Sequence, residues 1–298
     1  MENSGVVKIK IHLEGKAFDP KDGYNLFYLS ESLSNFQNLV EKTYLYTENK
    51  TQMSNVDREN LEVRLTNIEE GSFLSDAFIC IRDMTLPMVP LIAETKPELI
   101  WELIKQSYSY IRTTLKARKK GEVTKVEMND STGSLQVVDN HGDIIINNIN
   151  PAVIEVAEKT SPIYYRMAHL VTDDNRVEKI TFGEDGSTEK SISLGASEKE
   201  LFKRTTFLSD EVITVTGVMT RANGDSLTGR LEINDSEALE PGQYQVEFLE
   251  KDDAPKILKE SLFTNKTFTC MVRYSFDPIT LKDNVIGLKI IKMKTELN

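Results

Sequence analysis

Apolar and polar residues alternate along several short stretches of the chain, with the period of two that is typical of a half-buried β-strand. The first stretch is Val6–Leu13, and two more run from Asn60 to Asn67 and from Phe73 to Arg82. Gly71 lies in the tight connection between the last two stretches. Because glycine readily adopts turn conformations, this pair of stretches predicts a β-hairpin.

In two longer stretches the apolar residues instead recur at spacings of three and four, which is typical of amphipathic helices. One runs from Asn25 to Thr47, and the other from Pro97 to Lys120 with Pro97 in its first turn. The second helix has a heptad-like seam. We expect one face of it to pack on the N-terminal sheet and the other to meet a partner helix. The seam consists of Trp101, Ile104, Tyr108, Ile111 and Leu115.

The middle of the chain predicts a small module of short strands and one helix. The strands are expected at 123–127, 134–138 and 144–149, with turns between them. A helix follows from Pro151 to Leu170, with an interruption at Ser161-Pro162 because proline cannot supply the helical N–H. Val177–Phe182 and Ser191–Leu194 predict a second hairpin, and Ser197–Phe202 a short capped helix.

From Thr206 onward the pattern is mostly of strands, with one helix inserted at Ala254–Leu262. Such a run predicts a small barrel of OB or SH3-like type. The fold class is therefore α+β. We expect an N-terminal α/β sandwich-like domain at 1–121, a small central α/β module at 122–204, and the barrel-like domain at 205–298. The predicted strands are 212–218, 228–233, 244–248, 267–274 and 287–293.

Composition narrows the class of partner. The chain has 298 residues and a net charge of −11. Because phosphate contacts dominate nucleic-acid affinity, this acidity argues against nucleic acid as the main partner and favours basic surfaces. Residues 1–13 lack the apolar core of a signal peptide, and no apolar stretch approaches the length of a membrane span. We therefore expect a cytoplasmic protein that does not contact membranes.

No pattern of catalytic or metal-binding residues emerges. The two cysteines, Cys80 and Cys270, lie in apolar runs and are expected to be buried free thiols, although the sequence does not exclude a disulfide. The histidines His12, His141 and His169 are far apart and lack metal-ligand spacing. Phosphate-binding loops and nucleophile elbows are missing from the sequence as well. We expect neither a cofactor nor an enzyme.

Two weak metal-site patterns have simpler explanations. Asp57 followed by Glu62 and Arg64 is faintly similar to the metal-binding carboxylates of nucleases, but an ordinary amphipathic strand explains Glu62 and Arg64 equally well. The stretch Asp139–Asp143 offers carboxylates for calcium, yet it lacks the glutamate and the helices of an EF-hand. Turn formation explains it better.

The basic end of the helix at 97–120 is the candidate contact surface of the chain. Lysines and arginines there compensate the helix dipole, and beside tyrosines they also form a candidate for nucleic-acid contact. The same helix supplies our candidate partner interface. This consists of Trp101, Tyr108, Arg112, Lys119 and Lys120.

The order of several segments resembles a loose group of bacterial and phage proteins for which no activity is established. These segments are Ser32–Gln37, Glu70–Phe73, Pro97–Lys105 and Gly142–Asn147, within a resemblance that covers about residues 6–200. They are turns, caps and core positions, so no functional residues follow from them. The resemblance implies a setting of mobile elements and phage–host conflict.

These observations together predict a non-enzymatic, oligomer-forming protein whose partner is another protein. Its most concrete form is an inhibitor of a bacterial anti-phage defence complex, which would bind and block a nuclease-type assembly through its acidic surface. A sensor or adaptor subunit of a defence system is the alternative within the same class. A metal-dependent nuclease with a hidden site and a nucleic-acid-binding module remain as alternatives from other classes.

Overall fold

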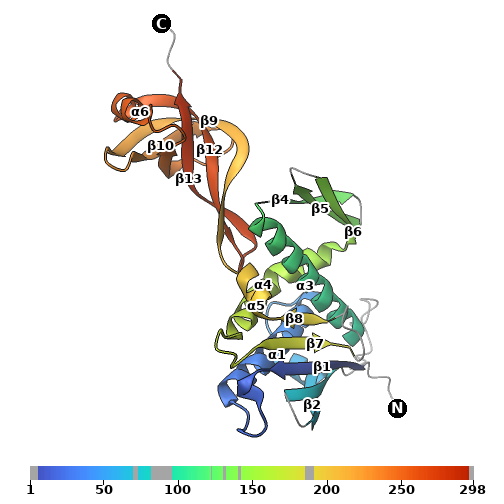
Figure 1. Cartoon of the computed structure of the whole chain (residues 1–298). Helices are drawn as coiled ribbons and strands as arrows, with labels where there is room; N and C mark the ends of the chain where they lie inside the picture. Colours follow the sequence, from blue (N-terminus) through green and yellow to red (C-terminus); the bar gives the residue numbers. More distant parts are fainter. Residues whose placement is uncertain are drawn as a thin grey trace. The chain divides into compact units, whose positions relative to one another are not determined.

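The computed structural model describes residues 6–69, 73–81, 96–121, 123–129, 132–139, 142–184 and 191–294. Contacts divide the chain into two compact units (Figure 1). Unit 1 comprises Met1–Lys203 with Pro278–Leu281, and unit 2 comprises Arg204–Asp277 with Lys282–Asn298. Both units contain helices and sheets, so the predicted α+β class is confirmed.

A five-stranded sheet in the order β2-β3-β1-β7-β8 forms the base of unit 1, and all its neighbouring strands are antiparallel. Both predicted strand pairs, β2 with β3 and β7 with β8, are confirmed. In β1, Ile9, Ile11 and Leu13 are fully buried whereas the residues between them reach solvent. The strands are β1 (Val6–Glu14), β2 (Leu61–Glu69), β3 (Phe73–Ile81), β7 (Lys179–Gly183) and β8 (Ile192–Leu194).

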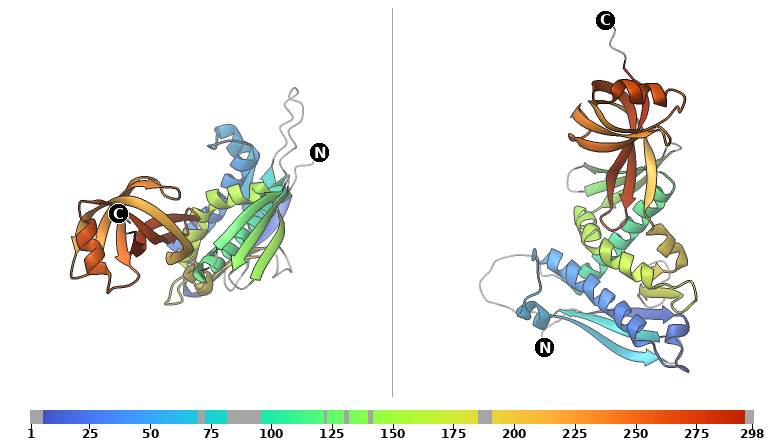
Figure 2. Two further views of the ribbon diagram at one scale, coloured as in Figure 1. Left: turned by 90° about the horizontal axis from the view of Figure 1, so that it is seen from above. Right: turned by 90° about the vertical axis from the view of Figure 1, so that its left-hand side faces the viewer.

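Three long helices pack on one another, and the right-hand view of Figure 2 shows them gathered over one face of the sheet. The seam of α3 is buried throughout. The partner helix that the seam predicts is α4 of the same chain, because the Tyr164 hydroxyl donates to the carbonyl oxygen of Ile104 at 3.1 Å. The helices are α1 (Leu26–Thr47), α2 (Asn55–Asn60), α3 (Pro97–Lys119), α4 (Pro151–Leu170) and α5 (Ala196–Leu201), with a 3-10 turn at Lys16–Phe18.

The predicted interruption of the helix at Ser161-Pro162 is wrong, because α4 continues through Pro162 to Leu170. Proline inside a helix removes one backbone hydrogen bond and crowds the preceding turn. Packing opposes that cost, since Val156, Ala157 and Tyr164 around this point are fully buried. Tertiary burial on two neighbouring helices therefore outweighs the local preference.

Between α3 and α4 the chain forms a three-stranded antiparallel sheet in the order β4-β5-β6. Its strands are β4 (Val123–Asn129), β5 (Thr132–Asp139) and β6 (Gly142–Ile149). His141 and the centre of the Asp139–Asp143 turn lie outside the described residues. The three-domain division at 1–121, 122–204 and 205–298 stays a prediction, although the packing of α3 on α4 groups helices from both sides of residue 121.

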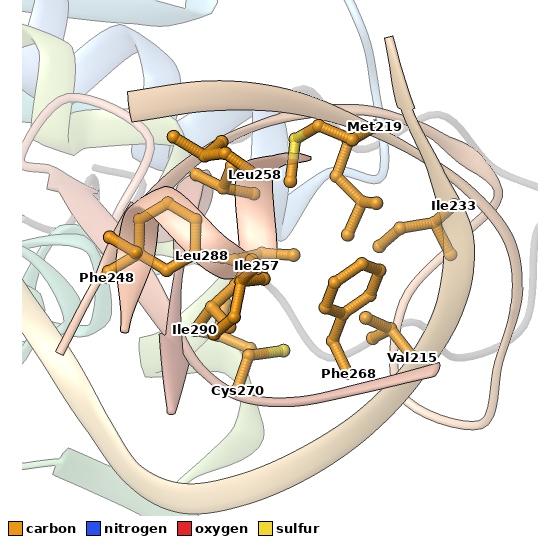
Figure 3. Packing of buried hydrophobic residues seen from close by; sticks show 14 of the residues in the cluster. Val215, Met219, Ile233, Phe248, Ile257, Leu258, Phe268, Cys270, Leu288 and Ile290 are labelled. Carbon is orange, nitrogen blue, oxygen red and sulfur yellow. The ribbon is translucent and has the colours of Figure 1, made fainter. Parts of the chain in front are cut away.

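Unit 2 is a closed barrel in the order β10-β11-β13-β12-β9, with β11 parallel to β13 and the other neighbours antiparallel. Figure 3 shows its packed interior, which α6 helps to fill through Ile257 and Leu258. Its elements are β9 (Thr205–Asn223), β10 (Thr228–Ser236), β11 (Gly242–Phe248), α6 (Ala254–Ser261), β12 (Asn265–Asp277) and β13 (Lys282–Met293).

Neither cysteine forms a disulfide, as expected. Cys270 is buried in the barrel interior, and burial raises the pKa of its thiol to about 12. Cys80 in β3 is half-buried, so the prediction of a buried thiol holds for Cys270 alone. No helix in the described part of the chain has the length and apolar character needed to cross a membrane.

Close approaches between barrel strands occur at three glycines. A Cβ on Gly287 would lie 2.8 Å from the carbonyl oxygen of Gln245 on β11, and one on Gly229 would lie 2.8 Å from that of Arg221. A Cβ on Gly217 would collide with the backbone of Glu232. Because a backbone atom is among the obstacles at each of the three positions, the strands must separate to admit any side chain. These glycines therefore permit the barrel to close.

We expect Gly217→Ala to lower the free energy of unfolding of the barrel by about 1–3 kcal/mol, the usual cost of overpacking. The matched control is Gly224→Ala in the turn between β9 and β10, where nothing lies within 4 Å of an added Cβ. Urea unfolding followed by methyl NMR signals of the barrel interior would measure both variants. Equal midpoints for the two variants would contradict the role of Gly217 in barrel closure.

Candidate functional site

A polar groove runs between α3 and β8, the strand at one end of the described sheet. One cavity of about 390 Å³ is lined by Glu102, Lys105, Gln106, Ser109 and Arg112 of α3 together with the start of β8. A second, of about 580 Å³, continues past Arg112 to α5. Tyr108, Arg112 and Ser191 line both cavities, so the two form one groove.

The groove follows from the helical spacing of α3. Trp101 and Tyr108 belong to the buried seam, and Lys105, Ser109 and Arg112 recur at spacings of four and three beside it. Burial of the seam therefore fixes which polar side chains face β8. On the far side of the groove from α3, β8 pairs with β7, and Ser193 lies opposite Thr181 in that pair.

At one end of the groove, Glu184 holds two side chains of α3. Its Oε1 accepts from Trp101 Nε1 at 2.9 Å and from Lys105 Nζ at 2.8 Å. Glu102 pairs with the same ammonium at 2.8 Å. Burial favours the neutral amine, but the hydrogen bonds to Glu102 and Glu184 outweigh it and raise the pKa of Lys105.

At the other end, Glu198 of α5 pairs with Arg112 at 3.2 Å. The same carboxylate accepts from the Ser197 hydroxyl at 2.7 Å and from the Gly195 N–H at 3.3 Å. Burial opposes ionisation, but these hydrogen bonds together lower the pKa of Glu198. Glu198 therefore connects α5 to α3 as a charged group.

Tyr108 forms the floor of the groove. Its hydroxyl donates to the carbonyl oxygen of Ser193, so a side chain of α3 already contacts the backbone of β8. Burial raises the pKa of this phenol far above its ordinary value, with the charge of Glu198 adding to the effect. Tyr108 therefore stays protonated at neutral pH and acts as a hydrogen-bond donor.

These pKa shifts indicate which chemistry the groove favours. A general acid or base works best with a pKa near the operating pH. In the groove, the pKa of Lys105 is raised, that of Glu198 is lowered, and that of Tyr108 is raised, so all three move away from neutrality. Fixed charges and fixed donors suit recognition of a ligand more than proton transfer.

No protein-family model, curated protein or solved structure matches the chain. The groove is therefore interpreted from its own geometry. Within the described ranges, no three His, Cys, Asp or Glu side chains gather closely enough to hold a metal ion.

The structure separates the five predicted interface residues. Trp101 and Tyr108 are 1% and 7% exposed, so their side chains are core rather than surface. Arg112 lines the groove and remains half-exposed. Lys119 and Lys120 are exposed at the far end of α3 and do not line either cavity. The assignment of these five residues to a partner interface stays a prediction.

The nuclease-like residues are held apart in structural roles. Asp57 is almost fully buried, where it accepts from the Ser54 backbone and hydroxyl and pairs with Lys50 at 2.5 Å. Burial opposes its ionisation, but these contacts lower the pKa of Asp57. Glu62 pairs with Arg64 along β2. Asp57 therefore caps α2 and holds the loop that precedes it.

Sequence reasoning missed most of the groove. Lys105, Lys179, Glu184 and Ser193 gave no local signal, because their meeting depends on how α3 crosses the end of the sheet. In the sequence, Glu198 is distinguished only as an acidic residue in the first turn of the helix predicted at Ser197–Phe202. Glu198 lies three residues after Gly195, which is the spacing of a capping box. This spacing alone indicates that its carboxylate accepts a hydrogen bond from the N–H of Gly195.

We expect Glu198→Gln to destabilise unit 1 at pH 7, because the charged contact with Arg112 is lost. A lowered pKa means that Glu198 stabilises the fold above its ordinary value of 4.5 and that this contribution disappears as pH falls below it. The difference in unfolding midpoint between wild type and Glu198→Gln should therefore shrink from pH 7 to pH 3. Urea unfolding at several pH values measures it.

Glu59→Gln makes the same charge change on an exposed side chain of α2 and serves as the control. Its midpoint should follow wild type across the pH range. A pH-independent difference for Glu198→Gln would contradict a stabilising role of the charged carboxylate.

Proposed function

We propose that this chain is a non-enzymatic protein-binding protein whose contact surface includes the groove between α3 and β8. The observation that supports this most directly is the position of the groove beside the end strand of a sheet. A groove between a helix and the edge of a sheet can hold an extended segment of another protein, whose side chains then contact the polar residues of the helix.

The fixed charges of the groove also support a binding role. Paired side chains such as Lys105–Glu184 and Arg112–Glu198 are oriented before a partner arrives. Binding to oriented groups loses less conformational entropy than binding to free ones. A segment lying in the groove would meet donors and acceptors that are already in place.

Within this class we propose an inhibitor of a bacterial anti-phage defence complex, with a sensor or adaptor subunit of such a system as the alternative. The net charge of −11 supports the inhibitor, because an acidic protein is attracted to the basic groove of a nuclease. A homo-oligomer and a cytoplasmic location belong to the same proposal.

The first test is affinity purification of the tagged protein from bacteria that carry candidate defence systems, with identification of retained proteins and a native mass of the complex. We expect a stoichiometric protein partner. A folded protein that retains no partner and has the mass of a monomer would overturn the proposal and direct attention to ligand and nuclease screens.

The groove itself is tested by Ser109→Trp, which places a large side chain on an exposed position of α3 that lines the cavity. We expect about tenfold less retained partner, which corresponds to about 1.4 kcal/mol. Lys116→Trp adds the same side chain to an exposed position of α3 outside the groove and should retain the wild-type amount. Equal losses in both variants would exclude the groove as the contact surface.

Single-stranded nucleic acid is a second candidate, because the barrel of unit 2 supports an assignment to the OB type. It has five strands, a helix between the third and the fourth, and the third strand parallel to the fifth. OB barrels bind oligonucleotides on the face of their second and third strands. Here the outer residues of β10 and β11 include Glu232 and Glu247 beside Arg230, a poor match for phosphate.

Titration of a labelled thymidine oligonucleotide at several salt concentrations tests this candidate. Nucleic-acid binding predicts a steep loss of affinity with salt and a further loss on charge reversal at Lys119 and Lys120. We expect instead no saturable binding at physiological salt, because Glu232 and Glu247 on this face oppose phosphate. Salt-sensitive, saturable binding would favour the nucleic-acid candidate over protein binding.

A further inference from the structure

The two ends of the five-stranded sheet differ in what their backbone can bind. At one end, β8 has three residues, and the Tyr108 hydroxyl already donates to the carbonyl oxygen of Ser193. At the other end, β2 has nine residues, and β3 is the one strand that pairs with it in the part of the chain that the structure describes. A strand that is paired on one side directs alternate N–H and C=O groups away from its neighbour.

The centre of β2 keeps these backbone groups available. At the two ends of its regular stretch, the Leu61 N–H donates to the carbonyl oxygen of Asp57, and the carbonyl oxygen of Thr66 accepts from the Ser75 hydroxyl. Between them, the described residues offer the backbone of residues 63–65 no hydrogen-bond partner outside β3. The register with β3 is regular from Leu61 to Thr66 and shifts only after it. This short stretch therefore presents a free strand edge at its centre.

Leu65 is an apolar side chain on the helix-covered face of the sheet that the chain leaves exposed. It lies opposite Ala77 of β3, which is fully buried, yet Leu65 itself is 40% exposed. Leu61 is on the same face, four residues earlier, and is 6% exposed. A further strand beside β2 would cover Leu65. Its burial therefore favours a strand that brings an apolar residue opposite it.

The sequence of this stretch is complementary to itself in the antiparallel direction. It reads Leu61-Glu62-Val63-Arg64-Leu65, with leucine at both ends and opposite charges on either side of the central valine. When two copies pair with Val63 opposite Val63, each Glu62 faces Arg64 of the other copy, and each Leu61 faces Leu65. Apolar pairs and opposite charges both stabilise strand positions that face each other.

The same charges disfavour the neighbouring registers. Sliding the two copies by two residues in either direction places Glu62 opposite Glu62 or Arg64 opposite Arg64, and like charges at facing positions are destabilising. Within one copy, Arg64 pairs with Glu62, and the Arg64 side chain is still 60% exposed. Because a guanidinium has five N–H donors, Arg64 can reach the second copy without losing its own carboxylate.

We propose that the chain forms a homodimer in which β2 pairs antiparallel with β2 of a second copy, about a two-fold axis at Val63. Each copy contributes the same surface to such a contact, and the two five-stranded sheets become one continuous sheet. This rests on the homo-oligomer in the proposed function and gives it a contact surface. The groove between α3 and β8 lies at the other end of the sheet, so the dimer leaves it open for a partner protein.

The test is sedimentation velocity of the purified full chain at several protein concentrations. We expect a reversible dimer for the wild type. Glu62→Arg and Arg64→Glu each place like charges opposite one another at both symmetric positions, so the dissociation constant of the dimer should rise about tenfold in each variant. The double variant Glu62→Arg, Arg64→Glu exchanges the two charges, restores both pairs and should dimerise as the wild type does.

A mixture of the two single variants distinguishes pairing between copies from a structural role within one copy. The Glu62→Arg chain has only cations at these two positions and the Arg64→Glu chain only anions, so the mixture should form a heterodimer although neither variant pairs well with itself. Loss of the ion pair within one copy predicts no such rescue. Amide hydrogen exchange at residues 63–65 should slow as the dimer forms, because their backbone becomes paired.

Lys203→Glu is the matched control, because it reverses the charge of an exposed side chain outside β2. It should dimerise as the wild type does. Circular dichroism would confirm that every variant is folded.

Several outcomes would overturn the proposal: a wild type that is a monomer at every concentration, a dimer that neither single variant weakens, no heterodimer in the mixture, or unchanged exchange at residues 63–65. The proposed function is judged separately by the retained partner. If a stoichiometric partner is retained while the chain alone stays a monomer, the protein-binding function stands and the β2 dimer does not. If the chain dimerises through β2 and retains no partner, the reverse holds.

Discussion

Burial of the α3 seam is the constraint on which unit 1 depends. Trp101, Tyr108 and Ile111 are enclosed between the sheet and α4, and the Tyr108 and Tyr164 rings meet at 5.2 Å between centroids. Once this face of α3 is fixed, the helical spacing determines which of its side chains face β8. The position of the groove thus follows from core packing, and the polar contacts of Glu184 and Glu198 hold its side chains.

Sequence periodicity predicted the elements well because it reports local structure. The alternation at Val6–Leu13, the helices at 25–47 and 97–120, and the strands of the C-terminal region all correspond to elements of the fold. The exception at Pro162 shows the limit of local reasoning. A proline predicts the loss of one hydrogen bond, but the sequence does not state how deeply the helix around it will be buried.

The groove was less predictable than the fold for a related reason. Trp101 and Tyr108 were interpreted as partner contacts because large aromatic residues at helical spacing suit either a core or an interface. Only the tertiary position of α4 decides between the two. Lys179 and Arg112 are 67 positions apart in the sequence, and nothing local indicates that they line one cavity.

Two ion pairs of unit 1 differ in how far their side chains are exposed to solvent. Asp57 with Lys50 closes a loop onto α1, and the Asp57 carboxylate is buried together with its hydrogen bonds to Ser54. Arg112 and Glu198 also join two elements, but the guanidinium keeps part of its surface in water. A guanidinium has five N–H donors, and a single carboxylate does not use them all. Arg112 can therefore hold α5 in place while part of its guanidinium stays in contact with water.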